Sequence, residues 1–249
     1  MMFDLIVRGD IAILRLDRPE VRNAVPLGGW GELGDGVDKA VAAGARVLIL
    51  AGIPDGAFCA GADVSDFGAF AGDEAARSRF RLAIRAGLGR LRDASIPTIA
   101  MIEGAAYGAG LALAMACDVR LAGPKAQLAA TPAKLGISYP QEDVHRLVAL
   151  VGPGQAARLL LSAGSVDGAE AERIGLVERY YPSDLEAEAL ILAGQIAAND
   201  PDSLRVLKRG IRLAETGLAT DAEQDGSFDA LLGSQALTDR LATLRKPRS

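Results

Sequence analysis

The stretches AFCAGADV, residues 57–64, and EGAAYGAG, residues 103–110, each follow a short apolar run that is typical of a buried strand. These runs are Val47–Ala51 and residues 97–102. Glycine and alanine in such turns let a ligand approach the backbone closely. The second turn also opens a helix, and the first amides of a helix have no partner within it and lie at its positive end. If the two turns face each other, two backbone N–H groups point at one oxygen, which is the arrangement of an oxyanion hole.

The residues alone leave other interpretations open. Glycine turns commonly make tight strand-to-helix connections with no ligand. A dinucleotide-binding fingerprint also joins a strand, a glycine-rich turn and a helix, but it requires G-x-G-x-x-G. Gly108-Ala109-Gly110 continues with Leu111-Ala112-Leu113, so the third glycine is missing. A nucleotide-binding oxidoreductase therefore has little support, whereas a purely structural turn and an oxyanion site both remain possible.

Outward from the turns, apolar runs alternate with helical periodicities. Residues 3–7 and Ile11–Leu16, separated by Arg8-Gly9-Asp10, predict a β-hairpin. Further strands are predicted at Val119–Ala122 and Gln127–Ala129. Strands that alternate with helices indicate an α/β fold, and the helical second half indicates a C-terminal appendage. The predicted helices are 27–43, 77–92, 111–116, 141–151, 153–162, 168–174, 185–199, 202–216 and 221–244.

The chain of 249 residues is half hydrophobic, which is enough for a sizeable core in one large domain. Its formal net charge of −5 argues against nucleic acid as the main partner, because a polyanion binder carries a basic face. No segment reaches the roughly 20 apolar residues that span a bilayer, and the first ten residues lack the pattern of a signal peptide. The two cysteines, Cys59 and Cys117, favour a reducing compartment over a disulfide scaffold. We expect a cytoplasmic protein with no membrane partner, and we find no His/Cys/Asp cluster with metal-ligand spacing.

Five segments, in order along nearly the whole chain, carry a resemblance to a known family. They are RPEVRNA (18–24), AFCAGADV (57–64), MIEGAAYGAG with the following residues to Asp118 (101–118), TPAKLG (131–136) and AEAERIGLV (169–177). The second and third resemble the two CoA motifs of the crotonase superfamily, that is, the enoyl-CoA hydratase/isomerase family, and the others resemble its remaining landmarks. Several motifs together are far more specific than any one of them.

The resemblance implies a fold and an assembly. The fold is a crotonase-like spiral of strand-strand-helix units, which we assign to residues 1–190 as the acyl-CoA-binding core. Residues 191–249 then form a C-terminal helical region for oligomerisation, with apolar residues between 228 and 244 available for burial. The expected partners are an acyl-CoA substrate and further copies of the chain, in a homotrimer or a dimer of trimers.

The resemblance also implies where the substrate binds. The residue before the aspartate of the first motif donates one oxyanion-hole N–H, and this position is Ala62. The second donor falls on Ala109, in the middle of the glycine turn. Because both donors are backbone amides, alanine is tolerated at each position. Coenzyme A is expected as part of the substrate, with no separate cofactor, and its contacts are expected from Ala60, Ala62, Asp63, Val64, Ser65, Gly108 and Ala109.

The chain departs from the family where the chemistry is done. Family members that hydrate enoyl-CoA use two glutamates, which fall on Ala112 and Pro132 here. The isomerase branch carries one acid near Pro140, which is not acidic either. The methylmalonyl-CoA decarboxylase branch shares the Thr-Pro-x-x-Leu-Gly-x-x-Tyr pattern of residues 131–139, an aromatic residue at Tyr107 and a histidine at His145. That branch nevertheless has histidine in place of Ala62 and glutamate in place of Ala112.

Four side chains near these positions are candidates for acid–base chemistry. Tyr139 is a candidate for hydrogen bonding to a substrate carboxylate, or else a core tyrosine. Glu142 and Asp143 fall in the first turn of a predicted helix, where acidic residues favour the helix dipole in any case. His145 is the single histidine, and a structural role is the alternative for it.

We therefore predict an enzyme of the enoyl-CoA hydratase/isomerase family that binds an acyl-CoA thioester and stabilises its enolate oxyanion. The usual hydratase glutamates are absent at Ala112 and Pro132. The alternatives are an acyl-CoA decarboxylase-like enzyme and a catalytically silent acyl-CoA-binding protein of the same fold.

Overall fold

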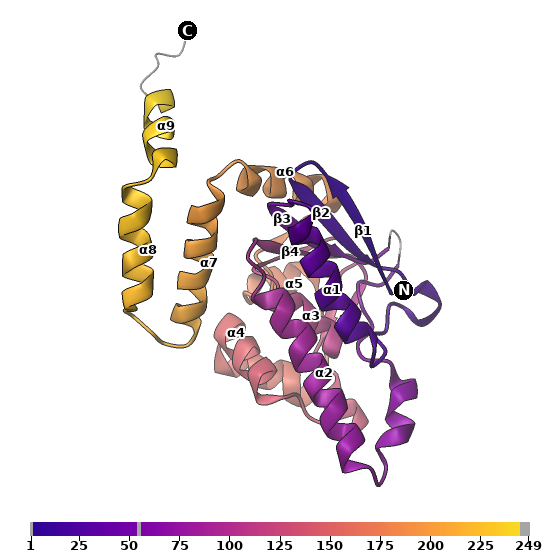
Figure 1. Ribbon diagram of the computed structural model, residues 1–249. Helices are drawn as coiled ribbons and strands as arrows, with labels where there is room; N and C mark the ends of the chain where they lie inside the picture. Colours follow the sequence, from indigo (N-terminus) through magenta and orange to yellow (C-terminus); the bar gives the residue numbers. More distant parts are fainter. Residues whose placement is uncertain (1, 54–55, 245–249) are drawn as a thin grey trace.

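The computed structural model describes residues 2–53 and 56–244 and is built around a six-stranded sheet (Figure 1). Its strands lie in the order β1-β2-β3-β4-β6-β9. The first pair is antiparallel, as the predicted hairpin requires, and the other pairs are parallel. The strands are β1 (Phe3–Arg8), β2 (Ile11–Leu16), β3 (Val47–Ala51), β4 (Thr98–Ile102), β6 (Val119–Ala122) and β9 (Arg179–Tyr180).

Both faces of this sheet are buried, because its central strands β3 and β4 are apolar apart from Thr98. In β3, Leu48 and Leu50 belong to the larger core, whereas Val47 and Ile49 belong to a second core on the opposite face. The helix on that opposite face is α6 (Leu185–Ala197), which buries four residues against the sheet. The helices on the side of the larger core are α1 (Gly29–Ala42), α2 (Glu74–Arg92) and α3 (Ala109–Ala116).

A second, three-stranded sheet lies beside the first and includes strands that the sequence pattern did not predict. It consists of β5 (Ala105–Tyr107), β7 (Gln127–Ala129) and β8 (Ser165–Asp167). We expected the second glycine turn to lead directly into a helix, but β5 precedes that helix. The turn is therefore held by strand pairing to β7 before α3 begins.

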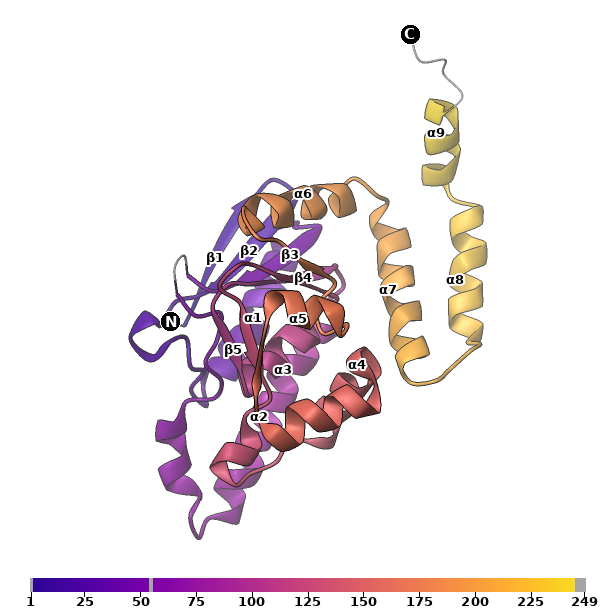
Figure 2. The ribbon, with the colours of Figure 1, turned by 180° about the vertical axis from the view of Figure 1, so that it is seen from behind.

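The second half of the chain is helical, as predicted, and comprises α4 (Gln141–Ser162), α5 (Gly168–Arg173), α7 (Pro201–Glu215), α8 (Ala222–Leu232) and α9 (Gln235–Leu244). The division expected between residues 190 and 191 lies within α6. Helices α7 and α8 form an antiparallel pair at the side of the molecule, and α9 extends beyond α8 away from the sheet (Figures 1 and 2).

One helix was expected over 221–244, and this prediction was wrong. Helix α8 ends at Leu232 with Gly233 as its C-cap, and the Leu237 amide donates a hydrogen bond to the Ser234 hydroxyl at 3.1 Å, which caps α9. Glycine is a poor helix former and serine is a preferred N-cap, so the pair Gly233-Ser234 divides the segment.

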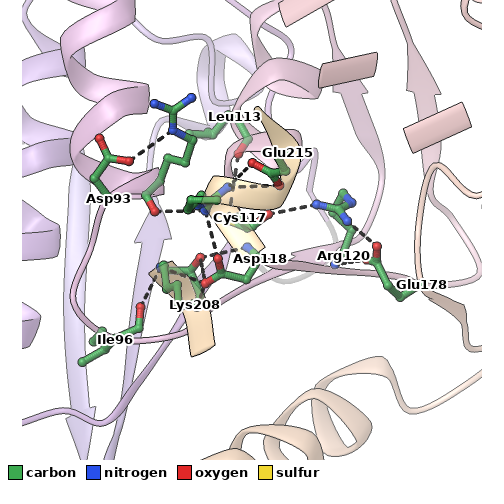
Figure 3. Close-up of polar contacts among 12 residues, drawn as sticks. Asp93, Ile96, Leu113, Cys117, Asp118, Arg120, Glu178, Lys208 and Glu215 are labelled. Atoms are coloured by element: carbon green, nitrogen blue, oxygen red, sulfur yellow. Dashed lines mark hydrogen bonds and ion pairs between the residues drawn. The ribbon is translucent and has the colours of Figure 1, made fainter. Parts of the chain in front are cut away.

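Helix α7 is tied to the sheet by a cluster of charged side chains around Asp118 (Figure 3). Its carboxylate lies 2.8 Å from the Lys208 ammonium and 2.9 Å from the Arg212 guanidinium, both on α7. It also accepts hydrogen bonds from the Thr98 amide and hydroxyl at the start of β4. Lys208 is only 7% exposed, and its ammonium also donates to the Ile96 carbonyl.

Candidate active site

The two glycine turns lie against each other and are joined by backbone hydrogen bonds. The Cys59 amide donates to the Ala105 carbonyl at 2.8 Å, and the Tyr107 amide donates to the Cys59 carbonyl at 3.0 Å. The first turn is paired on its other edge with Val25, whose amide donates to Gly61 and whose carbonyl accepts from Asp63. The structure thus brings together the two segments that the sequence pattern singled out.

Two glycines make this contact possible. Gly61 has φ +115°, and a Cβ there would stand 2.9 Å from the Tyr107 carbonyl oxygen and 3.5 Å from the Ala109 amide nitrogen. A Cβ on Gly110 would stand 2.1 Å from the Cys59 carbonyl oxygen. Neither side chain fits between the turns, so both positions require glycine.

The amides of Ala62 and Ala109 are left without acceptors by this arrangement. The pairing with Val25 uses the groups of Gly61 and Asp63 on either side of Ala62. Ala109 is the first residue of α3, and the first amide of a helix has no partner within it. Within residues 2–53 and 56–244, neither amide takes part in a hydrogen bond. Both residues line the same cavity.

This cavity has a volume of about 450 Å³ and a largely apolar lining. One wall is a cluster of Phe67, Phe70 and Phe80, whose ring centroids lie 4.9–5.6 Å apart. Helix α2 contributes Arg77, Phe80, Arg81 and Ile84, which is the i, i+3, i+4, i+7 spacing of one helical face. That periodicity is present in the sequence, within the helix predicted over 77–92.

The opposite wall runs from the 3₁₀ helix η3 (Pro132–Leu135) into the start of α4. Tyr139 and Asp143 lie on this wall. The Tyr139 hydroxyl donates to the Gly108 carbonyl at 2.6 Å, next to the Ala109 amide. Burial, with a smaller contribution from the Asp143 carboxylate, raises the pKa of Tyr139 well above its usual value, so the hydroxyl stays protonated.

Asp143 is 2% exposed, although it lies in the first turn of α4. Burial raises the pKa of its carboxyl to about 6, and the guanidinium of Arg146, at 3.4 Å, acts in the opposite direction. A carboxyl group with this pKa is suited to accept and release a proton near neutral pH.

The structure does not bring the other two side-chain candidates to the cavity. Glu142 makes a two-point ion pair with Arg85, with both distances 2.7 Å, which holds the pKa of Glu142 below its usual value. His145 is exposed, and its Nε2 lies 3.4 Å from the Glu215 carbonyl on α7. The orientation of α4 about its own axis turns Asp143 toward the cavity and turns Glu142 and His145 away from it.

Of the residues expected to bind CoA, Ala60, Ala62, Val64, Gly108 and Ala109 line the cavity. Asp63 and Ser65 do not line it. Asp63 accepts hydrogen bonds from the Ser65 amide and hydroxyl and pairs with Arg18 at 3.0 Å, so it supports the turn. The hydrogen bonds from Ser65, and to a smaller extent the pairing with Arg18, hold the pKa of Asp63 below its usual value.

Three other positions bear on the chemistry. Ala112 and Pro132 line the cavity, so neither position supplies a carboxylate there. Cys59 is fully buried, which raises the pKa of its thiol to about 12, and its sulfur donates to the Asn23 carbonyl. This cysteine is unsuited to act as a nucleophile.

Within residues 2–53 and 56–244 there is no group of three or more His, Cys, Asp or Glu side chains that could hold a metal ion. The helices of the same residues include none that is both long enough and apolar enough to cross a bilayer.

Comparison with known proteins covers almost the whole chain. Residues 7–230 match the family model described as enoyl-CoA hydratase/isomerase. The chain is 34% identical over 227 residues to the crotonyl-CoA hydratase of Syntrophomonas wolfei, covering 88% of this chain and 84% of that protein. It is 32% identical over 226 residues to the short-chain-enoyl-CoA hydratase of Clostridium acetobutylicum, covering 88% of this chain and 85% of that protein.

The crystal structure of an enoyl-CoA hydratase/isomerase family protein from Hyphomonas neptunium matches with a TM-score of 0.93 at 33% identity, over 100% of this chain and 97% of that chain. The α/β fold expected from the resemblance, with strand-strand-helix units and C-terminal helices, is therefore confirmed.

Proposed function

The chain belongs to the enoyl-CoA hydratase/isomerase family, and we propose that it binds an acyl-CoA thioester and stabilises the oxyanion that forms at the thioester carbonyl. One observation carries this proposal: the amides of Ala62 and Ala109 lack acceptors among the residues that the structure describes, belong to turns in direct contact, and line one apolar cavity. Preorganised N–H donors stabilise the charge that develops on an enolate oxygen, most strongly where water is excluded.

The CoA portion of the substrate is expected to follow the first turn. Ala60 and Val64 line the cavity there, and Val64 is largely exposed, which leaves the turn accessible to the adenine and pantetheine groups. Asp63 and Ser65 contribute by holding the turn in shape. No cofactor other than this CoA portion is part of the proposal. The two free, buried cysteines are compatible with action in the cytoplasm.

The reaction at the acyl group is proposed to be an enolate reaction that does not add water. The two relatives described above are named as hydratases, and hydration needs one group to hold and deprotonate water and another to protonate the α carbon. The resemblance places these groups at Ala112 and Pro132, which supply neither. Decarboxylation, isomerisation or α-proton exchange requires the oxyanion hole and at most one proton-transferring residue.

The test is turnover of crotonyl-CoA by the purified protein, followed as loss of enoyl absorbance. We expect hydration to be slower by at least ~10²–10⁴-fold than in a relative with both glutamates, because general acid–base catalysis contributes about this factor. A rate equal to that of the relative would contradict the proposed reaction class.

A panel of acyl-CoA thioesters, analysed by mass spectrometry, separates the remaining alternatives. Loss of carbon dioxide from a carboxylated acyl-CoA identifies a decarboxylase, and a shifted double bond identifies an isomerase. Recovery of every thioester unchanged, with measurable binding, would instead identify a silent acyl-CoA-binding protein.

A further inference from the structure

Asp143 is the single carboxylate that lines the cavity among the residues the structure describes. It is 2% exposed, and its side chain has one charged partner within 4 Å in that part of the chain, Arg146, at 3.4 Å. A buried carboxylate with one long ion pair is costly to maintain, because the Coulomb attraction does not fully offset the loss of hydration. The residue is therefore poorly explained by stability alone.

Asp143 also lines a second pocket beside the apolar cavity. This pocket has a volume of about 330 Å³ and shares only Ile84 and Asp143 with the first. Its lining is charged, and Arg85 on α2 exposes about half of its side chain to solvent. The remaining lining residues are Leu88, Gly89, Arg92, Asp93, Glu142 and Arg146.

The charged groups that face Asp143 come from two helices. Arg146 and Glu142 lie on its own helix, and Arg85 and Arg92 lie on α2. From α7, Arg212 and Glu215 face Arg146 and do not reach the carboxylate itself. Asp143 thus lines both the apolar cavity and a second pocket that contains Arg85, Arg92 and Arg146.

We propose that Asp143 is the catalytic residue that carries a proton between the α carbon of the acyl-CoA and solvent, through the pocket lined by Arg85, Arg92 and Arg146. The inference rests on the proposed function, because the proton is removed only if the enolate oxyanion is stabilised. In the step, a carboxylate oxygen of Asp143 takes the α proton, and the electrons of the C–H bond move to the thioester oxygen. The proton then leaves for solvent, and a solvent proton returns to the α carbon by the reverse path.

The position of Tyr139 supports this assignment. Its hydroxyl contacts the carbonyl of Gly108, next to the Ala109 amide, and its pKa is raised in part by the Asp143 carboxylate. The proton-carrying group and one oxyanion donor therefore both lie near the same tyrosine. A single carboxylate placed in this way moves one proton, which agrees with exchange, isomerisation or protonation after decarboxylation, and not with addition of water.

The experiment measures deuterium incorporation at the α carbon of butyryl-CoA, a saturated thioester, in D₂O by mass spectrometry. We expect exchange in the wild type and a ~10²–10⁴-fold slower rate in Asp143→Asn, with partial recovery in Asp143→Glu. Calorimetric binding of butyryl-CoA is expected to be retained in both variants. The exchange rate of the wild type should rise with pH as Asp143 ionises, through pH about 6.

The matched control is Asp202→Asn. Asp202 lies in the first turn of α7 and pairs with Arg205 at i+3, as Asp143 pairs with Arg146, but it is exposed and remote from the cavity lining. This variant should exchange at the wild-type rate. Full exchange in a folded Asp143→Asn protein would overturn the proposal and leave the proposed function standing.

A second pair of variants tests the route to solvent. A Cβ on Gly89 meets no heavy atom within 4 Å, so Gly89→Leu should fold and occupy the second pocket. Gly89 also borders a neighbouring pocket between α1 and α2, which Ala42→Leu would occupy without touching the second one. We expect deuterium incorporation to fall several-fold in Gly89→Leu and to stay unchanged in Ala42→Leu.

The outcomes separate this inference from the proposed function. Slow exchange in Asp143→Asn with normal exchange in Gly89→Leu would overturn the route through the second pocket. Binding of butyryl-CoA without exchange in the wild type would overturn the enolate function, and this inference with it.

Discussion

The N–H donor of Ala109 can be removed by a single substitution. Replacing Ala109 with proline eliminates the N–H donor, and the first position of a helix is where proline is tolerated. We expect enolate chemistry to slow by ~10²–10³-fold, which is the typical effect of losing one oxyanion-hole donor. The measurement is α-proton exchange, with the thermal midpoint recorded beside it.

Ala222→Pro is the control for this change. Ala222 is also the first residue of a helix, α8, and does not line the cavity. The Ala222→Pro variant should retain both the α-proton exchange rate and the thermal midpoint of the wild type. If a folded Ala109→Pro protein keeps the wild-type rate, the Ala109 amide is not an oxyanion donor.

The burial of Asp143 also predicts a pH-dependent effect on stability. Its pKa is raised from an ordinary 3.8 to about 6 in the folded protein, so the folded state holds this proton more tightly than the unfolded state does. The stabilisation from protonated Asp143 is complete below pH ~4 and is lost as the pH rises through about 6. At pH 7.5 the ionised, buried group lowers the free energy of unfolding.

We therefore expect Asp143→Asn to be more stable than the wild type at pH 7.5, and to differ little from it at pH 4. A pKa shift of this size corresponds to about 3 kcal/mol. Arg146 loses its partner in the variant, so the expected gain is smaller, about 1–2 kcal/mol. Urea denaturation at the two pH values measures it, with Asp202→Asn as the exposed control. A less stable variant at pH 7.5 would show that the ion pair with Arg146 outweighs the cost of burial.

At the scale of elements, one carboxylate makes two of the ion pairs that attach α7 to the sheet. Asp118 contacts both Lys208 and Arg212 and also the first residue of β4 (Figure 3). Burial is the main cause of the lowered pKa of Lys208, and its ion pair with Asp118 opposes that shift. Removing the carboxylate leaves a buried ammonium without a charge partner.

We expect Asp118→Ala to lower the free energy of unfolding by about 3–5 kcal/mol, because breaking a buried ion pair exposes the desolvation cost of the remaining charge. Asp202→Ala, which breaks an exposed pair, should cost less than about 1 kcal/mol. Chemical denaturation measures both. The double variant Asp118→Ala, Lys208→Met should recover part of the loss, and a double variant no more stable than Asp118→Ala would contradict this explanation.

At the scale of the whole molecule, the C-terminal helices present apolar side chains that the single chain does not cover. Phe228 and Leu232 on α8 and Leu241 on α9 are each more than 40% exposed. These helices stand away from the sheet (Figures 1 and 2). Unburied apolar surface of this extent is typical of an interface between subunits.

We expect a trimer or a dimer of trimers, measured as molar mass by light scattering at micromolar concentration. Phe228→Glu combined with Leu232→Glu should shift the protein to a smaller species, because charge at both positions opposes burial. Asp229→Asn on the same helix is the control. A monomer mass for the wild type would contradict the assembly.

Much of the fold could be predicted because its strands are continuous apolar runs. Val47–Ala51 and Thr98–Ile102 are buried on both faces, so their hydrophobicity marks them directly. The short strands β5, β8 and β9 were missed, although the equally short β7 was predicted, because two or three residues give only a weak periodic signal and pair with partners distant in sequence. The break at Gly233 was missed because apolar residues continue on both sides of it.

The sequence by itself determined the two glycine turns and the absence of carboxylates at Ala112 and Pro132, because these are matters of residue type and order. Only the tertiary structure decided which side chains share the cavity. Asp143, Glu142 and His145 lie within four residues of one another on α4, and each looks equally suitable in the sequence. The packing of α4 against α3 and the ion pair between Glu142 and Arg85 set the rotation of that helix. That rotation turns Asp143 into the cavity and the other two away, because a helix can bury only one of its faces.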